Sequence, residues 1–188
     1  NSLNALKKKG YEAEVLFAPH SDEIVESLKQ VSDDWLLFYN KKEMVFSQGQ
    51  FDSLEIAHQD VIVLKDENRQ IVSFLNVIKD FTEGECTYDL IRKTENAPGG
   101  SMDALIVKLV EYAKNKNYQF INFGLVPMKG IDTPDNPAEQ IMKYASDKIG
   151  SFKHYQTLKD FKDKYATIWE NKYLVFDNDF DVLQLPMA

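Results

Sequence analysis

The chain has 188 residues, of which 44% are hydrophobic and 12% aromatic, and its formal net charge at pH 7 is −8. This apolar content argues against intrinsic disorder, and the negative charge argues against a general, sequence-independent affinity for nucleic acids. No apolar run approaches the roughly 20 residues that a membrane-spanning helix needs.

The hydrophobic pattern predicts alternating strands and helices along most of the chain. The expected elements, in chain order, are the tail of a helix (1–10), a strand (11–17), a helix that begins after Ser21 as its N-cap, two strands around a polar turn at 66–69, a strand at 85–93, a helix at 101–115, a strand at 118–125, a helix capped by Asn136, a helix at about 154–166 and a strand at 172–176. We expect the chain to be the C-terminal part of a longer protein, folded as one domain over 1–188.

The helix at 101–115 has the clearest signature. Its apolar residues recur at intervals of three and four: Met102, Leu105, Ile106, Leu109, Val110 and Ala113. Ser101 is the expected N-cap, which puts Asp103 at the second helical position. The strand before this helix contains Cys86, the one cysteine of the chain, which excludes an internal disulfide and is interpreted as a buried thiol.

The order of the elements predicts the fold class. A strand–helix–strand unit at 86–92, 101–115 and 118–125 implies a right-handed parallel crossover, and the strands before it should pair as an antiparallel meander. We therefore expect a mixed, mostly antiparallel sheet with helices on both faces, in the α/β or α+β class. This order matches the GNAT-like acyltransferase fold, in which the helix after the fourth strand points its N-terminus at the pyrophosphate of an acyl donor.

Six short segments carry a resemblance to a known family. They are FSQGQFD (46–52), YDLIR (88–92), PGGSMDALIV (98–107), INFGLVPMKG (121–130), LKDFKDKY (158–165) and IWENKYL (168–174). In order and spacing they resemble the second GNAT-like half of the cytosolic catalytic region of bacterial phosphatidylglycerol lysyltransferases. The resemblance extends from about residue 3 to 176. The sequence departs from the family pattern at FKHYQTLK (152–159), where Thr157 replaces a usual glycine and Lys159 a usual arginine.

The resemblance implies an enzyme that moves an aminoacyl group, lysyl or similar, from aminoacyl-tRNA to the head group of phosphatidylglycerol, with aminoacyl-tRNA as co-substrate and no cofactor. It implies two further partners within the same protein, an upstream GNAT-like half and a membrane domain, and a location at the cytoplasmic face of the bacterial membrane. Because an upstream half is expected to be needed, the 188 residues alone are expected to be inactive.

Asp89 and Arg92 are the candidate catalytic residues. A regular strand puts residues three apart on opposite faces, so a β-bulge would be needed to bring these two side chains together. One interpretation is a structural ion pair. The other is that Asp89 binds the α-ammonium of the donor or orients the acceptor hydroxyl, while Arg92 binds a phosphate or carbonyl oxygen.

The remaining candidates are expected to bind substrate. Asp103 either stabilises its helix through the helix dipole or recognises a cationic aminoacyl group beside Ser101. Asn122 and Gly124 lie on one face of their strand, where they indicate either a bulge or a close approach of backbone to ligand. Three lysines lie in a segment (143–172) with a net charge of +3, and they are either solvated or in contact with phosphate: Lys159, Lys162 and Lys164.

Other kinds of site have little support. The three histidines have no metal-ligand spacing, so no metal site is expected, and no phosphate-binding loop or nucleophile-elbow motif occurs. Two alternatives to the lipid aminoacyltransferase remain open. One is an acetyl-CoA-dependent N-acetyltransferase, whose pyrophosphate the charge of Asp103 disfavours, and the other is a non-catalytic half of a tandem enzyme.

Overall fold

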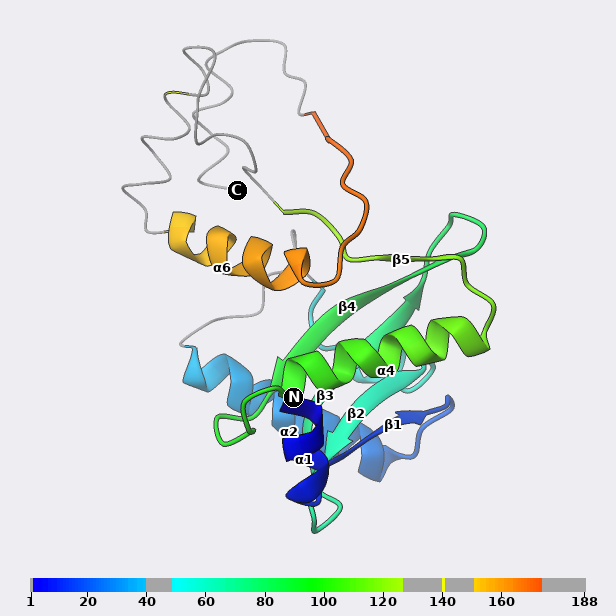
Figure 1. Ribbon diagram of the computed structural model, residues 1–188. Helices are drawn as coiled ribbons and strands as arrows, with labels where there is room; N and C mark the ends of the chain where they lie inside the picture. Colours follow the sequence, from blue (N-terminus) through cyan, green and yellow to red (C-terminus); the bar gives the residue numbers. More distant parts are fainter. Residues whose placement is uncertain (1, 40–48, 127–139, 141–150, 174–188) are drawn as a thin grey trace. The chain divides into compact units, whose positions relative to one another are not determined.

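The computed structural model describes residues 2–39, 49–126, 140 and 151–173 (Figure 1). The chain divides into two compact units, Asn1–Asn122 and Phe123–Ala188. None of the helices in the described ranges is both long enough and apolar enough to cross a membrane.

The first unit is a five-stranded sheet with helices on both faces. Its elements are α1 (Ser2–Lys8), β1 (Glu12–Leu16), α2 (Asp22–Phe38), α3 (Ser53–Ile56), β2 (Val61–Lys65), β3 (Ile71–Lys79), β4 (Glu85–Lys93), α4 (Ser101–Asn115) and β5 (Phe120–Asn122). The strand order is β1-β2-β3-β4-β5, antiparallel throughout except for the parallel pair β4 and β5. The predicted mixed sheet, the hairpin and the parallel connection through α4 are confirmed.

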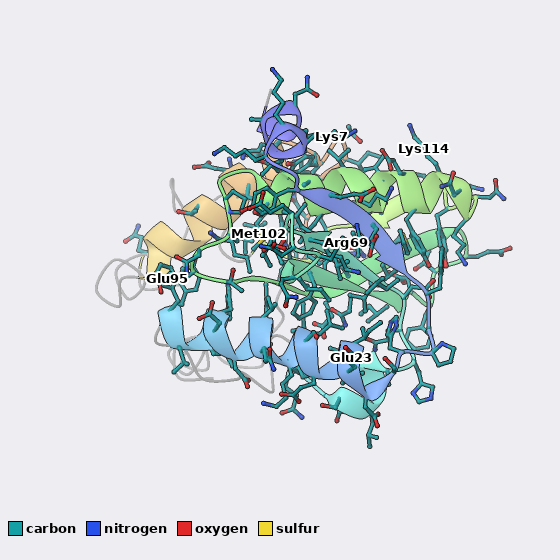
Figure 2. The ribbon with its side chains drawn as sticks, turned by 90° about the horizontal axis from the view of Figure 1, so that it is seen from below. Lys7, Glu23, Arg69, Glu95, Met102 and Lys114 are labelled. Carbon is teal, nitrogen blue, oxygen red and sulfur yellow. The ribbon has the colours of Figure 1, made fainter. Side chains whose placement is uncertain are left out.

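The two long helices cover opposite faces of the sheet. Figure 2 shows α4, marked by Met102 and Lys114, on one side of the strands and α2, marked by Glu23, on the other. On the α2 face a core forms from residues with at most 4% exposure: Leu28, Val31, Ile56, Val61, Val63, Phe74 and Leu90. On the other face α4 buries an apolar stripe that contains Leu105, Ile106 and Leu109. Each such side chain contributes about 1.5–3 kcal/mol through its burial, and together these contacts fix both helices on the sheet.

Two predicted helix starts differ from the structure in detail. Ser21 is the N-cap of α2 as predicted, but its side chain makes no capping hydrogen bond. The prediction that Ser101 caps α4 was wrong. Gly100 is the N-cap and Ser101 is the first helical residue, so Asp103 is the third rather than the second. The physical reason is that the chain enters α4 with φ at +90° at residue 100, a left-handed conformation that favours glycine over serine.

The predicted strand at 118–125 is shorter in the structure. β5 covers Phe120–Asn122, and two residues later Gly124 has φ at +71°, which is incompatible with a continuing strand. The prediction that Asn122 and Gly124 share one face of a strand was therefore wrong. The β4 prediction, by contrast, is confirmed at both ends, and Cys86 within it is 1% exposed.

The described part of the second unit contains one long helix, α6 (Ser151–Asp163), which begins and ends about three residues earlier than predicted. After the helix, the Tyr165 ring stacks on the Phe123 ring with 6.1 Å between centroids, and it meets the Phe161 ring edge-on at 5.6 Å. These ring contacts join the start of the unit to the end of α6. The predicted helix after Asn136 and most of the predicted strand at 172–176 lie outside the described residues.

Candidate active site

A β-bulge interrupts β4 at the candidate catalytic residues. On β3 a single residue, Asn76, lies between two consecutive paired positions, whereas on β4 two residues, Asp89 and Leu90, lie there. A bulge reverses the side on which the following residues point, so residues three apart come to lie on the same face. The bulge that the sequence analysis required for Asp89 and Arg92 is present.

The carboxylate of Asp89 faces the segment that leads into α3. Its Oδ1 accepts a hydrogen bond from the backbone N–H of Gly49 at 3.0 Å. Two residues later, the Phe51 ring packs edge-on against the Phe74 ring of the α2-side core, with 6.1 Å between centroids. A Cβ atom at residue 49 would lie 1.6 Å from Oδ2 of Asp89, so this approach requires glycine.

Arg92 lies on the same face, directly opposite Phe74, beneath α2. It is 4% exposed; its Nη1 donates to the Ser32 hydroxyl, and its guanidinium carbon lies 5.2 Å from the centre of the Trp35 ring. In the described part of the chain no ion pair joins Asp89 to Arg92. The structure therefore brings these two residues to one face and gives each of them partners from elements that cover that face.

The N-terminus of α4 belongs to the opposite face. Asp103 is in its first turn, where a carboxylate stabilises the helix by about 0.3–1 kcal/mol through the helix dipole. Ser101 is 1% exposed, and its hydroxyl donates to the carbonyl oxygen of Pro98 at 2.6 Å, inside the loop that precedes the helix. Ser101 thus stabilises the loop, and Asp103 lies on a helix that Asp89 does not face.

Asn122 lies at the end of β5 and is joined to β4 by two hydrogen bonds. Its Nδ2 donates to the carboxylate of Glu85 at 2.7 Å, and its carbonyl oxygen accepts from the Thr87 hydroxyl at 2.8 Å. Both contacts fix the short parallel strand pair. The predicted ligand contact of Asn122 stays a prediction.

In the second unit, Lys162 is buried, unlike the solvated lysine that its position in a charged helix would indicate. Its side chain is 6% exposed, and Nζ donates to the carbonyl oxygen of Leu125 at 3.0 Å. Burial lowers the pKa of Lys162 to about 8, because removal from water disfavours the charged form. A Cβ atom at Gly124 would lie 3.7 Å from this ammonium, so the glycine and the lysine are neighbours.

The other two candidate lysines are held at the surface of α6 and its end. Lys159 pairs with Asp163 one turn along the helix, with 2.6 Å between nitrogen and oxygen. The ammonium of Lys164 lies 5.6 Å from the centre of the Phe161 ring. Among the described residues no group of three or more His, Cys, Asp or Glu side chains could hold a metal ion.

Comparison of the sequence with known protein families shows which family the chain belongs to. The family described as "Phosphatidylglycerol lysyltransferase, C-terminal" matches residues 1–176. The chain belongs to this family. A phosphatidylglycerol lysyltransferase of Bacillus subtilis (strain 168) is 33% identical over 175 residues, which are 92% of this chain and 20% of that protein. The chain therefore spans about a fifth of the length of the curated relatives that it matches.

Solved structures agree with the family and with the predicted fold. The structure of L-PGS from Bacillus licheniformis matches with a TM-score of 0.63 and 36% identity, over 72% of this chain and 41% of that one. An aminoglycoside acetyltransferase from a soil metagenome matches with a TM-score of 0.54 and 15% identity, over 92% of this chain and 98% of that one. At that identity the second match shows the fold alone, and it confirms the predicted acyltransferase fold.

The sequence patterns of this family member did not lead us to three residues near the candidate site. Ser32 and Trp35 contact Arg92, but they lie on α2, and their relation to β4 depends on how the helix packs. Asn76 contacts the bulge, and a signal for it existed, because it interrupts the apolar run IVSFLNVI at 71–78. A polar residue in such a run indicates a buried hydrogen bond.

Proposed function

We propose that this chain forms part of the catalytic region of a phosphatidylglycerol lysyltransferase, which moves a lysyl group from lysyl-tRNA to phosphatidylglycerol. The observation that carries the proposal is the family match over residues 1–176, which includes Asp89 and Arg92. The reaction lies at the cytoplasmic face of the membrane, where charged tRNA meets the lipid. The rest of the protein supplies an upstream GNAT-like half and a membrane domain, in keeping with the share of the relatives that this chain spans.

The reaction is a transesterification. A hydroxyl oxygen of the lipid glycerol attacks the ester carbonyl of the aminoacyl group, a new ester bond forms, and the bond to the terminal ribose of the tRNA breaks. The proton of the attacking hydroxyl ends on the ribose oxygen that leaves. Catalysis needs a site for the ammonium of the donor, a group that transfers the proton, and positive charge for the carbonyl oxygen.

We assign the first and third of these tasks to the α2 face of the first unit. The carboxylate of Asp89, oriented by the Gly49 amide, binds the α-ammonium of the donor. Arg92 stabilises negative charge on the carbonyl or phosphate oxygen, and because it is buried its charge is weakly screened by water. A guanidinium suits this role because it stays protonated at any physiological pH.

The second unit carries our candidates for contact with a phosphate of the tRNA or of the lipid: Lys159, Lys162 and Lys164. This role is proposed for the second unit by itself, independently of the roles of Asp89 and Arg92.

The test uses the full-length protein in vesicles that contain phosphatidylglycerol, with radiolabelled lysyl-tRNA as donor. We expect labelled lysine in the lipid fraction, and a loss of roughly 100-fold or more in the Asp89→Asn variant. The control is Glu83→Gln, an exposed carboxylate in the turn between β3 and β4, which should transfer at the wild-type rate.

Two results would overturn parts of the proposal. Absence of labelled lipid, together with acetylation of amines by acetyl-CoA, would favour the acetyltransferase alternative. Transfer that is unaffected by Asp89→Asn would favour the view that this half is not catalytic.

A further inference from the structure

The side chain of Asn76 is a buried amide in an otherwise apolar stretch of β3. It is 2% exposed, and its neighbours along the strand include Leu75 and Val77, both buried. An amide costs free energy when it is buried unless its donor and acceptor are both paired. A residue of this type in this position therefore indicates a specific hydrogen-bonding task.

Both ends of the amide are paired. The Asn76 Oδ1 accepts from the backbone N–H of Leu90 at 2.7 Å, and Nδ2 donates to Oε1 of Gln59 at 2.8 Å. The orientation of the amide is determined by chemistry, because a backbone N–H only donates and must face the oxygen. Gln59 in turn holds the nitrogen end, so the side chain has one arrangement.

The hydrogen bond to Leu90 is made at the bulge. An extra residue in a strand leaves a backbone N–H without a ladder partner, and a buried N–H without a partner is costly. The Asn76 oxygen supplies the acceptor that the strand ladder lacks. Without it, a regular pairing of β3 with β4 would be favoured, and Asp89 would point away from the face that holds Arg92.

We propose that Asn76 is a positioning residue whose amide maintains the bulge in β4. The hydrogen bond to Gln59 holds this amide in place. The bulge in turn directs the Asp89 carboxylate towards the Gly49 amide, on the face that holds Arg92. Among the described residues, the Asn76 side chain makes no hydrogen bond to the side chain of Asp89 or Arg92, and it acts through the backbone of β4. The catalytic consequence rests on the proposed function, whereas the structural consequence does not.

The kinetic test compares two variants of the full-length protein. Asn76→Leu keeps the size and removes both hydrogen bonds, and Asn76→Asp keeps an oxygen towards Leu90. Lysyl transfer per folded molecule should fall about tenfold or more in Asn76→Leu and less in Asn76→Asp. The double variant Asn76→Leu with Asp89→Asn should be no slower than Asp89→Asn alone, because both changes remove the same contribution, that of a correctly placed Asp89 carboxylate. Additive losses would overturn the proposal.

The matched control is Val61→Ala. Val61 pairs with Asn76 across β2 and β3, is fully buried in the same core, and its apolar side chain makes no hydrogen bond to the bulge. It should lower the melting temperature while the rate per folded molecule stays unchanged. A loss of rate in Val61→Ala that equals the loss in Asn76→Leu would show a general effect of stability and would overturn the positioning role.

A second readout does not depend on activity. Hydrogen exchange of the full-length protein, followed in peptides that contain Gly49 and in peptides from 86–92, reports the amides that the bulge protects. In Asn76→Leu the Gly49 amide should exchange faster, although its hydrogen bond is to Asp89 and not to residue 76. If the wild-type protein transfers no lysine, the proposed function fails, and this measurement decides on Asn76: faster exchange at Gly49 supports the inference, and unchanged exchange overturns it.

Discussion

Among the residues that the structure describes, two cations are buried, one in each unit, and their surroundings differ. Arg92 in the first unit has a hydroxyl and an aromatic ring against its guanidinium. Lys162 in the second unit has one backbone carbonyl, and no carboxylate of the described residues pairs with it. The first environment suits a charge that is permanent, and the second holds an ammonium whose pKa burial lowers to about 8. The contribution of a buried cation therefore depends on the groups that replace water around it, and not on burial alone.

The largest expected effect comes from removal of the permanent charge. Arg92→Met has a similar length and should fit beneath α2, so the free energy of unfolding should change by no more than about 1–2 kcal/mol. Lysyl transfer should fall by roughly 1,000-fold, because the developing oxyanion loses its positive charge. Parallel denaturation and transfer measurements check this, with Arg92→Lys expected to restore little, since an ammonium does not stack as a planar guanidinium does. Wild-type transfer by Arg92→Met would leave Arg92 with a purely structural role.

The lowered pKa of Lys162 makes a prediction for the stability of the fold, with a definite sign. The folded-state pKa lies below the unfolded value, so between about 8 and about 10.5 the unfolded chain binds more protons. Desolvation of the ammonium therefore destabilises the fold fully below pH 8, and this cost disappears as the pH rises towards 10.5. Chemical denaturation at several pH values should show this gain in wild type and not in Lys162→Met.

The smallest effect concerns the ring that contacts Arg92. Trp35→Leu removes a cation–π contact worth about 0.5–2 kcal/mol and keeps an apolar side chain on α2. Lysyl transfer should fall about fivefold, because the guanidinium keeps its charge but loses the ring that packs against it. Transfer at the wild-type rate in Trp35→Leu would leave this ring contact without a role in the reaction.

Much of the first unit was predictable because its elements depend on local patterns. The hairpin around 66–69, the bounds of β4 and the apolar stripe of α4 follow from periodicity, and the structure confirms them. The start of α4 was less predictable, because serine and glycine both occur at N-caps and the backbone conformation at residue 100 decided between them. Asn122 and Gly124 were grouped by strand alternation, and the early end of β5 removed the basis for that grouping.

The sequence by itself determined the order of the elements, the mixed sheet and the family, because six motifs and a hydrophobic period are properties of the linear chain. It also indicated that Asp89 and Arg92 need a bulge to share a face. Only the tertiary structure decided that Asn76 from the neighbouring strand meets that bulge and that Ser32 and Trp35 enclose Arg92. It likewise decided that Lys162 is buried while Lys159 and Lys164 are not. These features depend on which surfaces pack together, and hydrogen bonding and desolvation act between residues that are distant in the sequence.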